Sequence, residues 1–541
     1  MAPACLPDEN RADTYTVDII NEAAALLRAG RLVAFPTETV YGLGAYAFDE
    51  AAIREVYNVK GRPSDNPLII HIENAGQLDL LTSEITEPVK RLIDRFWPGP
   101  LTLIFKRRAD LPICATAGLE TVAVRMPSHP VARALLKAAG VPVSAPSANP
   151  SGKPSPTDGK HVIEDLTGKI DMIIDSGPVN IGLESTVLDV SRTPAVILRP
   201  GGVTRESIAE VIGAENVILW SEPQSGSDRE PQSGSDREPQ SGSDREPQSG
   251  SDREPGFRPV SPGMKYRHYA PDAPMLLFDG NTKNVVLWMG LYIQSNFKKD
   301  EKIGVLATDR VLSRLGGKLP ENAAALSLGN PDMPEAAARA LYDALRAFDK
   351  IGVTKIYGEL YGGGGIGAAV KDRMTRASGA NVINADDPAI LFVCSGNTCR
   401  SAMAEALFNS FPQSPRSSSA GIYATDGAMA TFEAINAMTV FGADITGHRS
   451  RRLDYRLLER SGVVLTMTGA HKYEILKRYP TMSTRVFTYT DFAMKLPPEE
   501  NGVAVIGDIE DPFGLGQEEY QKCAEKLYVL AARLSAATGR K

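Results

Sequence analysis

Cysteine is scarce in this sequence. Five cysteines occur in 541 residues, an odd number, and two of them lie close together at positions 394 and 399. This usage argues against a disulfide framework and for a reducing compartment. An excess of basic residues is also lacking, because 59 Lys and Arg stand against 66 Asp and Glu and the net charge is −7. No overall basic field therefore indicates a nucleic-acid or membrane surface.

Long apolar runs are missing as well. The longest, near residues 285–293, is far too short to span a bilayer. Residues 1–10 lack the basic and apolar regions of a signal peptide. We therefore expect a cytoplasmic protein with no membrane partner.

What is present is an ordinary globular composition, 43% hydrophobic and 23% charged. The chain is too long for one core, and it predicts several α/β domains. One segment differs: between residues 222 and 253 the octapeptide Glu-Pro-Gln-Ser-Gly-Ser-Asp-Arg occurs four times in tandem. The repeat has no apolar residue, so we predict that residues 221–255 are a disordered linker without function rather than a binding tail.

The most informative stretch is residues 394–401, Cys-Ser-Gly-Asn-Thr-Cys-Arg-Ser. The apolar run 390–393 predicts a buried strand before it, and residues 402–408 predict a helix after it. A loop between a strand and a helix N-terminus favours a bound phosphate and a thiolate. Cys394 would attack phosphorus, and Arg400 would hold the phosphate oxygens. The other candidates in this loop are Ser395, Gly396, Asn397, Thr398, Cys399 and Ser401. The alternative is an ordinary loop with a buried cysteine.

This stretch resembles the loop of the low-molecular-weight protein tyrosine and arginine phosphatases. Further motifs of that family follow in order: Ser419-Ala-Gly421, residues 447–453, Thr466-Met-Thr468 and Asp511-Pro-Phe-Gly514. The resemblance covers residues 389–541 and implies a phosphatase domain, 386–541, with a central parallel sheet. It also implies that Asp511 protonates the leaving group and later activates water. Ala402 stands where the family usually has proline, which should affect the helix start more than the chemistry.

Thr398 bears on the substrate. In the resembling family this position carries threonine in arginine-phosphatase members and isoleucine in many tyrosine-phosphatase members. A hydroxyl can hydrogen-bond a polar substrate, and Phe513 offers an aromatic face to a guanidinium. We therefore expect phosphoarginine in a protein substrate, against the alternatives of phosphotyrosine or any exposed aryl phosphate. An arsenate reductase is disfavoured, because it relays electrons through two later cysteines and only Cys523 lies downstream.

A second set of motifs lies before the repeat. Residues 18–29 predict an amphipathic helix, and a strand at 32–35 leads into Pro-Thr-Glu-Thr-Val-Tyr-Gly-Leu-Gly at 36–44. Hydroxyls, a carboxylate and glycines at the end of a strand suit a small polar ligand. Residues further along the chain also have structural explanations when each is taken alone. Lys60 and Arg62 could form a solvated turn, His71 in the strand 68–72 could be a core histidine, and Ser147 and Asn149 could cap a turn.

Together these motifs resemble the YrdC-like threonylcarbamoyl-adenylate synthases from about Val17 to Val211. Residues 261–271 are similar to the linker of the longer, two-domain branch. The resemblance implies that L-threonine, bicarbonate and ATP give threonylcarbamoyl-AMP and pyrophosphate, and that the product feeds tRNA threonylcarbamoylation through partner proteins. The ATP-binding candidates that it implies are Lys60, Arg62, Asn66, Thr121, Ser147, Asn149, Ser155, Arg199 and Tyr269. The threonine-binding candidates are Thr39, His71, Arg125, Ala145 and Ser185.

Adenylate formation consists mostly of positioning and charge neutralisation, so it needs cations and a dry pocket. Arg125 is the natural partner of the threonine carboxylate. We expect Mg²⁺ with the triphosphate and no other cofactor, although no carboxylate cage is visible. A competing interpretation is a double-stranded RNA-binding module. Such a module needs clustered basic residues, whereas the candidate cations are dispersed in the sequence.

The predicted domains of this part are a synthase domain at 1–220, a linker at 256–272 that closes over the nucleotide, and an accessory α/β domain at 273–385. The accessory domain alternates strands and helices, including a helix at 334–350 and a strand at 354–357. Its glycine-rich segment 361–367 lacks the lysine of a P-loop and the spacing of a dinucleotide fold. We predict a flexible turn there, before a helix that begins near Ala368.

Overall fold

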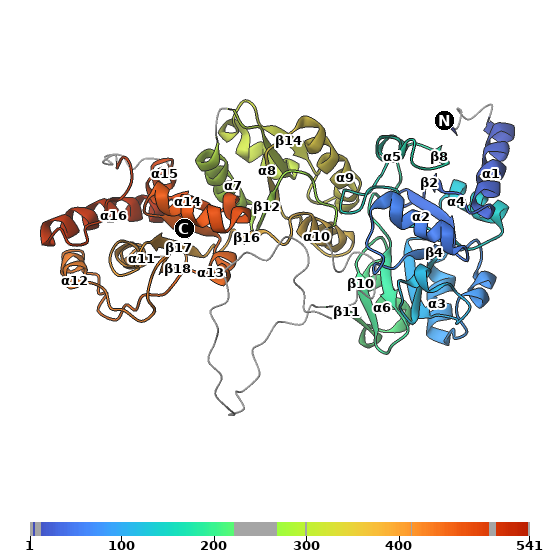
Figure 1. Ribbon diagram of the computed structural model, residues 1–541, viewed down its shortest axis with the longest axis horizontal. Helices are drawn as coiled ribbons and strands as arrows, with labels where there is room; N and C mark the ends of the chain where they lie inside the picture. Colours follow the sequence, from blue (N-terminus) through green and yellow to red (C-terminus); the bar gives the residue numbers. More distant parts are fainter. Residues whose placement is uncertain are drawn as a thin grey trace.

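The computed structural model describes residues 4–5, 12–220, 268–297, 300–412, 414–496 and 505–538. They form three α/β units that follow one another along the long axis of the molecule (Figure 1). Each unit has its own sheet, which confirms the predicted α/β class. The octapeptide repeat and most of the expected linker lie outside the described residues. Within the described ranges, no helix has both the length and the apolar character needed to cross a bilayer.

The N-terminal unit is built on a mixed sheet. Its strands are β1 (Ala4–Cys5), β2 (Val33–Phe35), β3 (Gly42–Tyr46), β4 (Ile69–His71), β5 (Leu101–Lys106), β6 (Thr121–Arg125), β7 (Val143–Ser144), β8 (Met172–Asp175), β9 (Thr186–Asp189), β10 (Ala195–Arg199) and β11 (Val217–Leu219). They lie in the order β1-β8-β2-β3-β7-β4-β6-β5-β9-β10-β11. The helices are α1 (Ala12–Arg28), α2 (Glu50–Lys60), α3 (Glu87–Phe96), α4 (Pro130–Ala139), α5 (Gly159–Leu166) and α6 (Arg205–Ile212). The predicted helix and strands correspond to α1, β2 and β4.

Strand register brings separate motifs of this unit together. The parallel pair β4 and β6 sets His71 opposite Arg125. An isolated bridge joins Gly42 to Ser147. Helix α2 ends at Gly61, whose φ of 58° lies in the left-handed region that glycine adopts without strain. The chain therefore turns back immediately before Arg62.

The middle unit has a parallel sheet in the order β14-β13-β15-β12-β16. Its strands are β12 (Met275–Asp279), β13 (Ile303–Ala307), β14 (Ala324–Ser327), β15 (Lys355–Glu359) and β16 (Val382–Asn384), and its helices are α7 (Thr282–Asn296), α8 (Asp309–Leu315), α9 (Pro334–Ile351) and α10 (Ile366–Ala377). The predicted helix and strand correspond to α9 and β15. The glycine-rich segment forms a turn, and the helix after it begins at Ile366, slightly earlier than expected.

The C-terminal unit has the expected central parallel sheet, in the order β18-β17-β19-β20. Its strands are β17 (Ile390–Cys394), β18 (Ser417–Gly421), β19 (Val463–Thr466) and β20 (Val486–Thr488), and its helices are α11 (Arg400–Ser410), α12 (Phe432–Thr439), α13 (Tyr455–Arg460), α14 (Gly469–Arg478), α15 (Tyr489–Met494) and α16 (Gln517–Thr538). Strand β17 ends on Cys394 and α11 begins at Arg400, so the predicted strand–loop–helix arrangement is present.

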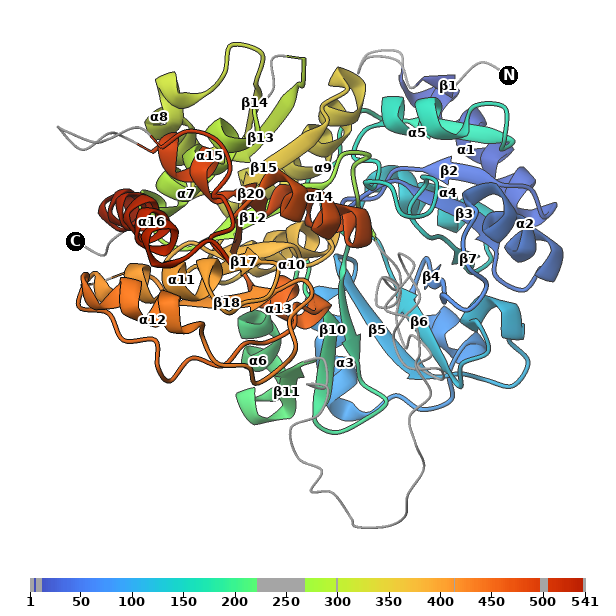
Figure 2. The ribbon, with the colours of Figure 1, turned by 60° about the vertical axis from the view of Figure 1, so that its left-hand side comes forward.

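The middle and C-terminal units share one core. A single cluster of buried apolar side chains runs from α7 and β12 into β17, β19 and α16. At the junction the ring of Tyr292 lies edge-on against Phe487, with 5.0 Å between centroids, and its hydroxyl donates to the carbonyl of Gly462. Arg485 Nε donates to Asn381 Oδ1 at 2.7 Å. Helix α15 lies beside α7 of the middle unit at this junction (Figure 1 and Figure 2).

Candidate active sites

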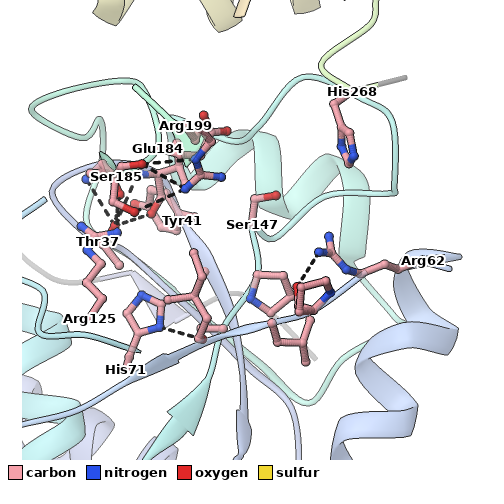
Figure 3. A pocket seen from close by; sticks show the side chains of 18 of the residues that line it. Thr37, Tyr41, Arg62, His71, Arg125, Ser147, Glu184, Ser185, Arg199 and His268 are labelled. Atoms are coloured by element: carbon pink, nitrogen blue, oxygen red, sulfur yellow. Dashed lines mark hydrogen bonds between the residues drawn. The ribbon is translucent and has the colours of Figure 1, made fainter. Parts of the chain in front are cut away.

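A cavity opens in the N-terminal unit where strand ends meet the first described residues after the repeat. It encloses about 610 Å³, open solvent at its mouth included. Figure 3 shows Glu184, Ser185 and Arg199 grouped on one side, and Arg62 and His268 on the other side, across Ser147. Polar side chains from distant parts of the sequence therefore face one space.

Arg125 lies at the end of β6 and is buried. Its Nη2 donates to Glu38 Oε1 at 2.6 Å, its Nη1 to Thr39 Oγ1 at 2.8 Å and its Nε to the Gly99 carbonyl at 3.3 Å. The backbone N–H of Ser128 donates to the other oxygen of Glu38. Burial raises the pKa of Glu38, but the charge and hydrogen bond of Arg125 outweigh burial and hold this pKa below its ordinary value. The pair is thus ionised and oriented.

Arg62 and Arg199 are bonded differently. Arg62 donates to the carbonyls of Asn66 and Pro67 at 3.1 and 2.9 Å. Arg199 donates to the carbonyl of Ser185 through Nε and Nη2 at 3.2 and 3.1 Å. Among the described residues, neither guanidinium has a carboxylate within ion-pair distance. Burial lowers the pKa of Arg199, and it lowers that of Arg62 to about 10.

Two histidines of the cavity wall are neutral near pH 7. Burial, followed by the charge of Arg125, lowers the pKa of His71 to about 3. The same effect of burial, followed by the charge of Arg62, lowers the pKa of His268 to about 3. The Nδ1 of His71 lies 3.2 Å from the carbonyl of Ile69, whereas His268 Nε2 is buried and has no hydrogen-bond partner among the described residues. The positive charge of the cavity therefore comes from arginines.

Glu184 is the second carboxylate of this wall, and it has partners from both sides of a unit boundary. Its oxygens accept hydrogen bonds from Ser155 Oγ at 2.6 Å, from Tyr342 on α9 at 3.0 and 3.1 Å, and from Arg373 Nε on α10 at 2.7 Å. Burial raises the pKa of Glu184, but the charges of Arg373 and Arg199 lower it to about 2. The carboxylate is therefore ionised although it is buried.

The second site is the loop between β17 and α11. Cys394 is buried, and its Sγ lies 3.0 Å from Ser401 Oγ and accepts the N–H of Asn397 at 3.3 Å. Asn397 has a φ of 56°, in the left-handed region that asparagine tolerates better than most residues. Its amide nitrogen donates to Ser401 and Ser419, and its Oδ1 accepts the N–H of Arg451. Asn397 therefore holds the loop around the sulfur.

Arg400 and Asp511 meet at this loop. The two side chains form an ion pair, and Arg400 Nη1 also donates to the Ile509 carbonyl at 3.1 Å. Ser395 Oγ lies 2.8 Å from His471 Nε2. Burial, followed by the charge of Arg400, lowers the pKa of His471 to about 4, so this histidine is neutral. The structure thus brings the predicted general acid, which is distant in the sequence, to the predicted anion clamp.

Cys399 lies on the same loop and is also buried. Its thiol donates to Asp511 Oδ1 at 3.9 Å, and burial followed by the charge of Cys394 raises its pKa to about 12. Thr398 is tied to the start of α12, because its carbonyl accepts the N–H of Thr431 at 2.9 Å. Phe513 is 68% exposed beside Asp511. An aromatic side chain close in the sequence to the ion-pair residue Asp511 is therefore exposed to solvent.

Comparisons with known proteins match all three units. A family model described as "Telomere recombination" matches residues 25–201, "Threonylcarbamoyl-AMP synthase, C-terminal domain" matches residues 203–379, and "Low molecular weight phosphotyrosine protein phosphatase" matches residues 389–541. The threonylcarbamoyl-AMP synthase of Bacillus subtilis is 43% identical over 365 residues, which are 67% of this chain and 94% of that protein. The chain belongs to the threonylcarbamoyl-AMP synthase family.

Further relatives belong to the same synthase family. The synthase of Pyrococcus abyssi is 42% identical over 364 residues, which are 67% of this chain and 95% of that protein. The crystal structure of P. abyssi Sua5 complexed with L-threonine is 39% identical, covers 71% of this chain and 99% of its own, and has a TM-score of 0.59. Residues 389–541 add a low-molecular-weight phosphatase domain, so the predicted fusion of two enzyme families is confirmed.

Only some of the predicted synthase residues line the cavity. The lining members are Thr39, Arg62, His71, Arg125, Ala145, Ser147, Ser185, Arg199 and Tyr269. Lys60 lies behind the wall and donates to the carbonyls of Ser147 and Asn149, and burial lowers its pKa well below the ordinary value. Its ammonium group therefore holds two backbone carbonyls of the cavity wall in place.

The remaining predicted residues are not among those that line the cavity. Thr121 lies at the opposite end of β6 from Arg125. Asn149 donates to the carbonyls of Pro150 and Lys153. The hydroxyl of Ser155 donates to Glu184, and the side-chain amide of Asn66 is buried and has no hydrogen-bond partner in the part of the chain that the structure describes.

The sequence interpretation did not select several residues that the site uses. Glu38, Thr37 and Tyr41 lie inside the motif 36–44, and Glu184 lies beside Ser185 in the motif 183–186, so sequence position alone marked them weakly. Arg373 and Tyr342 gave no signal, because their partner is more than 150 residues away in the chain. Such contacts are visible only in the folded molecule.

The described residues contain no group of three or more His, Cys, Asp and Glu side chains that could hold a metal ion. The two carboxylates near the cavity, Glu38 and Glu184, are both paired with arginines. Among the described residues, these two carboxylates are therefore not free to bind magnesium.

Proposed function

We propose that the cavity converts L-threonine, bicarbonate and ATP to threonylcarbamoyl-AMP and pyrophosphate. The observation that carries this proposal is the pair of the buried Arg199 and the half-buried Arg62, two guanidiniums on the cavity wall that have no carboxylate partner among the described residues. Burying a cation without a counter-ion is costly, and a polyphosphate would supply the missing charge. The names of the curated relatives point to the same reaction.

Threonine would bind at Arg125. The guanidinium holds Thr39 and Glu38 through one N–H of each terminal nitrogen, which leaves further N–H groups for the amino-acid carboxylate. The neutral rings of His71 and His268 add no charge that would compete. A related crystal structure was solved with L-threonine bound, which supports this assignment.

The chemical step would depend on position and charge. The threonine amine adds to carbon dioxide with loss of a proton, or to bicarbonate with loss of water, to give a carbamate. A carbamate oxygen then attacks the α-phosphorus of ATP while pyrophosphate leaves. The arginines bind and orient both reactants and neutralise the developing charge. Mg²⁺ with ATP would be held by the triphosphate itself. The product would be passed to the partners that transfer the threonylcarbamoyl group to tRNA.

Pyrophosphate release tests this proposal. Release should require threonine and bicarbonate together, and omission of either should abolish it. A double-stranded RNA-binding module would instead bind RNA and release no pyrophosphate. Arg125 and Arg199 are buried and Arg62 is half-buried around a small cavity, which disfavours that alternative because RNA needs exposed cations.

We propose that the C-terminal domain is a cysteine-dependent protein phosphatase that prefers phosphoarginine. Cys394 would attack phosphorus, Asp511 would protonate the leaving group, and water activated by Asp511 would then cleave the cysteinyl-phosphate. The phosphate would replace Asp511 on the fork of Arg400. Thr398 and the exposed ring of Phe513 support the choice of a guanidinium substrate.

Competition between two phosphopeptides tests the substrate. A peptide with phosphoarginine should show the larger kcat/KM, and Thr398→Ile should shift the ratio toward phosphotyrosine, because a methyl-lined wall suits a phenyl ring. A kcat/KM that favours phosphotyrosine in the unmodified protein would contradict the preference.

A further inference from the structure

The wall of the synthase cavity is not made by the N-terminal unit alone. Glu184 lines the cavity, and two of its hydrogen-bond partners, Tyr342 and Arg373, come from helices α9 and α10 of the middle unit. Arg373 is completely buried. Its Nη2 also donates to the carbonyl of Pro200 at 3.0 Å, next to Arg199. One side chain of the middle unit therefore holds two segments that carry cavity residues.

The two units touch at the backbone beside Glu184. Gly182 has a φ of 84°, and a Cβ on it would lie 2.6 Å from the Ala338 carbonyl oxygen and from Arg339 Cα, both on α9. No side chain fits between α9 and this loop. The segment that carries Glu184 and Ser185 is thus pressed directly against the middle unit.

A third cavity residue makes contact with the same cluster. The ring of Tyr269 lies 5.4 Å from that of Tyr342, and the guanidinium of Arg373 lies 5.5 Å from the centre of the Tyr269 ring. Tyr269 has a φ of 65°, a conformation that a tyrosine keeps only when its surroundings hold it. Arg373 therefore contacts both Glu184 and Tyr269.

These contacts determine the charge that a ligand meets. Arg199 donates to the carbonyl of Ser185, the residue after Glu184, and after Arg373 it is the described cation whose charge acts most on Glu184. A buried carboxylate without a partner is strongly unfavourable, and it would pair with Arg199. Arg199 would then no longer be free for an anion.

We propose that Arg373, assisted by Tyr342, is a positioning residue of the synthase: it binds Glu184 so that Arg199 stays available to the triphosphate, and the middle unit thereby completes the ATP side of the cavity. This inference rests on the proposed synthase reaction. It gives the accessory unit a role in nucleotide binding, for which the sequence offered no prediction.

The test compares Arg373→Met with the double variant Glu184→Gln/Arg373→Met in the full chain, by pyrophosphate release at varied ATP and varied threonine. Arg373→Met should raise the KM for ATP about tenfold or more and change the KM for threonine much less, because Glu184 then occupies Arg199. The double variant should recover most of the ATP affinity, since no carboxylate remains to compete. A purely structural role predicts a double variant no better than the single one.

Arg346→Met is the matched control. Arg346 also crosses from α9 to the N-terminal unit, donating to Asp165 Oδ2 and to the Pro154 carbonyl, each at 2.7 Å, but neither partner lines the cavity. Its loss should lower the melting temperature without changing the KM for ATP. An equal rise of that KM in Arg346→Met would show that any damage to the boundary has the same effect, and would overturn the inference.

Two further outcomes are decisive. If Arg373→Met does not fold, Tyr342→Phe removes one donor to Glu184 and should raise the KM for ATP about twofold to threefold, so an unchanged value would refute the proposal. If the unmodified protein releases no threonine-dependent pyrophosphate, the proposed function itself is wrong. An active protein whose Arg373→Met variant keeps its KM for ATP contradicts only the positioning role.

Discussion

At the residue scale, the arginines of the cavity fall into two kinds. Arg125 is paired with Glu38, whereas Arg62 and Arg199 are bonded to carbonyl and hydroxyl oxygens. A paired guanidinium keeps a defined orientation, and one that lacks a carboxylate attracts a mobile anion. The same chemical group can therefore orient an amino acid at one place and bind a triphosphate at another.

Arg125→Ala should raise the KM for threonine steeply and leave the KM for ATP nearly unchanged, because only the threonine carboxylate loses its guanidinium partner. It should also lower the free energy of unfolding by about 3–5 kcal/mol, since Glu38 becomes an unpaired buried charge. Arg125→Lys should not restore activity fully, because a point charge cannot replace two parallel donors. Kinetics and urea unfolding measure both effects, and equal losses for the two substrates would contradict the assignment.

Cys399 offers a second prediction. If Cys394 is oxidised to a sulfenic acid, the neighbouring Cys399 thiol can condense with it to a disulfide with loss of water. Peroxide should therefore inactivate the phosphatase reversibly, and Cys399→Ser should make the loss irreversible. Recovery of both proteins to the same extent after addition of a thiol would show that Cys399 does not protect the nucleophile.

His71 and His268 make the protein sensitive to acid. Their pKa values are about 3 when folded, against an ordinary value of 6.5, so the unfolded chain binds protons that the folded chain excludes. Their contribution is fully present above about pH 6.5 and is lost as the pH falls toward 3, by up to about 1.4 kcal/mol per pH unit for each histidine. Urea midpoints at falling pH should show this loss, and His71→Asn should make it shallower.

At the scale of elements, the strand β17, the loop after it and helix α11 were predictable, because an apolar run, a glycine and a helical period lie within one short stretch. Helix α9 and strand β15 were predictable for the same reason. The assignment of Lys60 and Thr121 to the ATP side has no such local basis, since sequence proximity does not say on which side of a strand or turn a side chain lies. Tyr342 and Arg373 depend on packing between units and had no local signal.

The contact of α9 with the loop at Gly182 gives a prediction for these elements. Gly182→Ala should lower the free energy of unfolding by about 1–3 kcal/mol and reduce synthase activity, because the added methyl group must push α9 away and the φ of 84° is strained for alanine. Gly168→Ala is the control, since Gly168 has a φ of 78° but open space around its Cβ position. A similar effect of both substitutions would assign the loss to backbone strain alone.

At the scale of the whole molecule, the three units are joined in two different ways. Around Glu184, polar contacts and two apolar side chains, Val40 and Leu183, join the N-terminal unit to the middle one, whereas a larger continuous apolar core joins the middle unit to the C-terminal one. Apolar cores unfold cooperatively. We therefore expect the middle and C-terminal units to unfold together.

Tyr292→Ala tests this expectation. The change removes the ring that packs against Phe487 and the hydroxyl that donates to Gly462, and should cost about 3–5 kcal/mol. Calorimetry should show the transition of the joined units shifting as one, while the transition of the N-terminal unit keeps its temperature. Separate shifts of the middle and C-terminal units would contradict a common core.

The shared core also matters while the chain is being made. Tyr292 leaves the ribosome long before Phe487, since roughly 200 residues separate them, and at about 5–20 residues per second the delay is on the order of 10–40 s. During that interval the apolar side chains of α7 that later pack against the phosphatase domain are exposed to solvent. A newly made chain should therefore engage a chaperone at this helix first, and release from it should follow synthesis of the final domain.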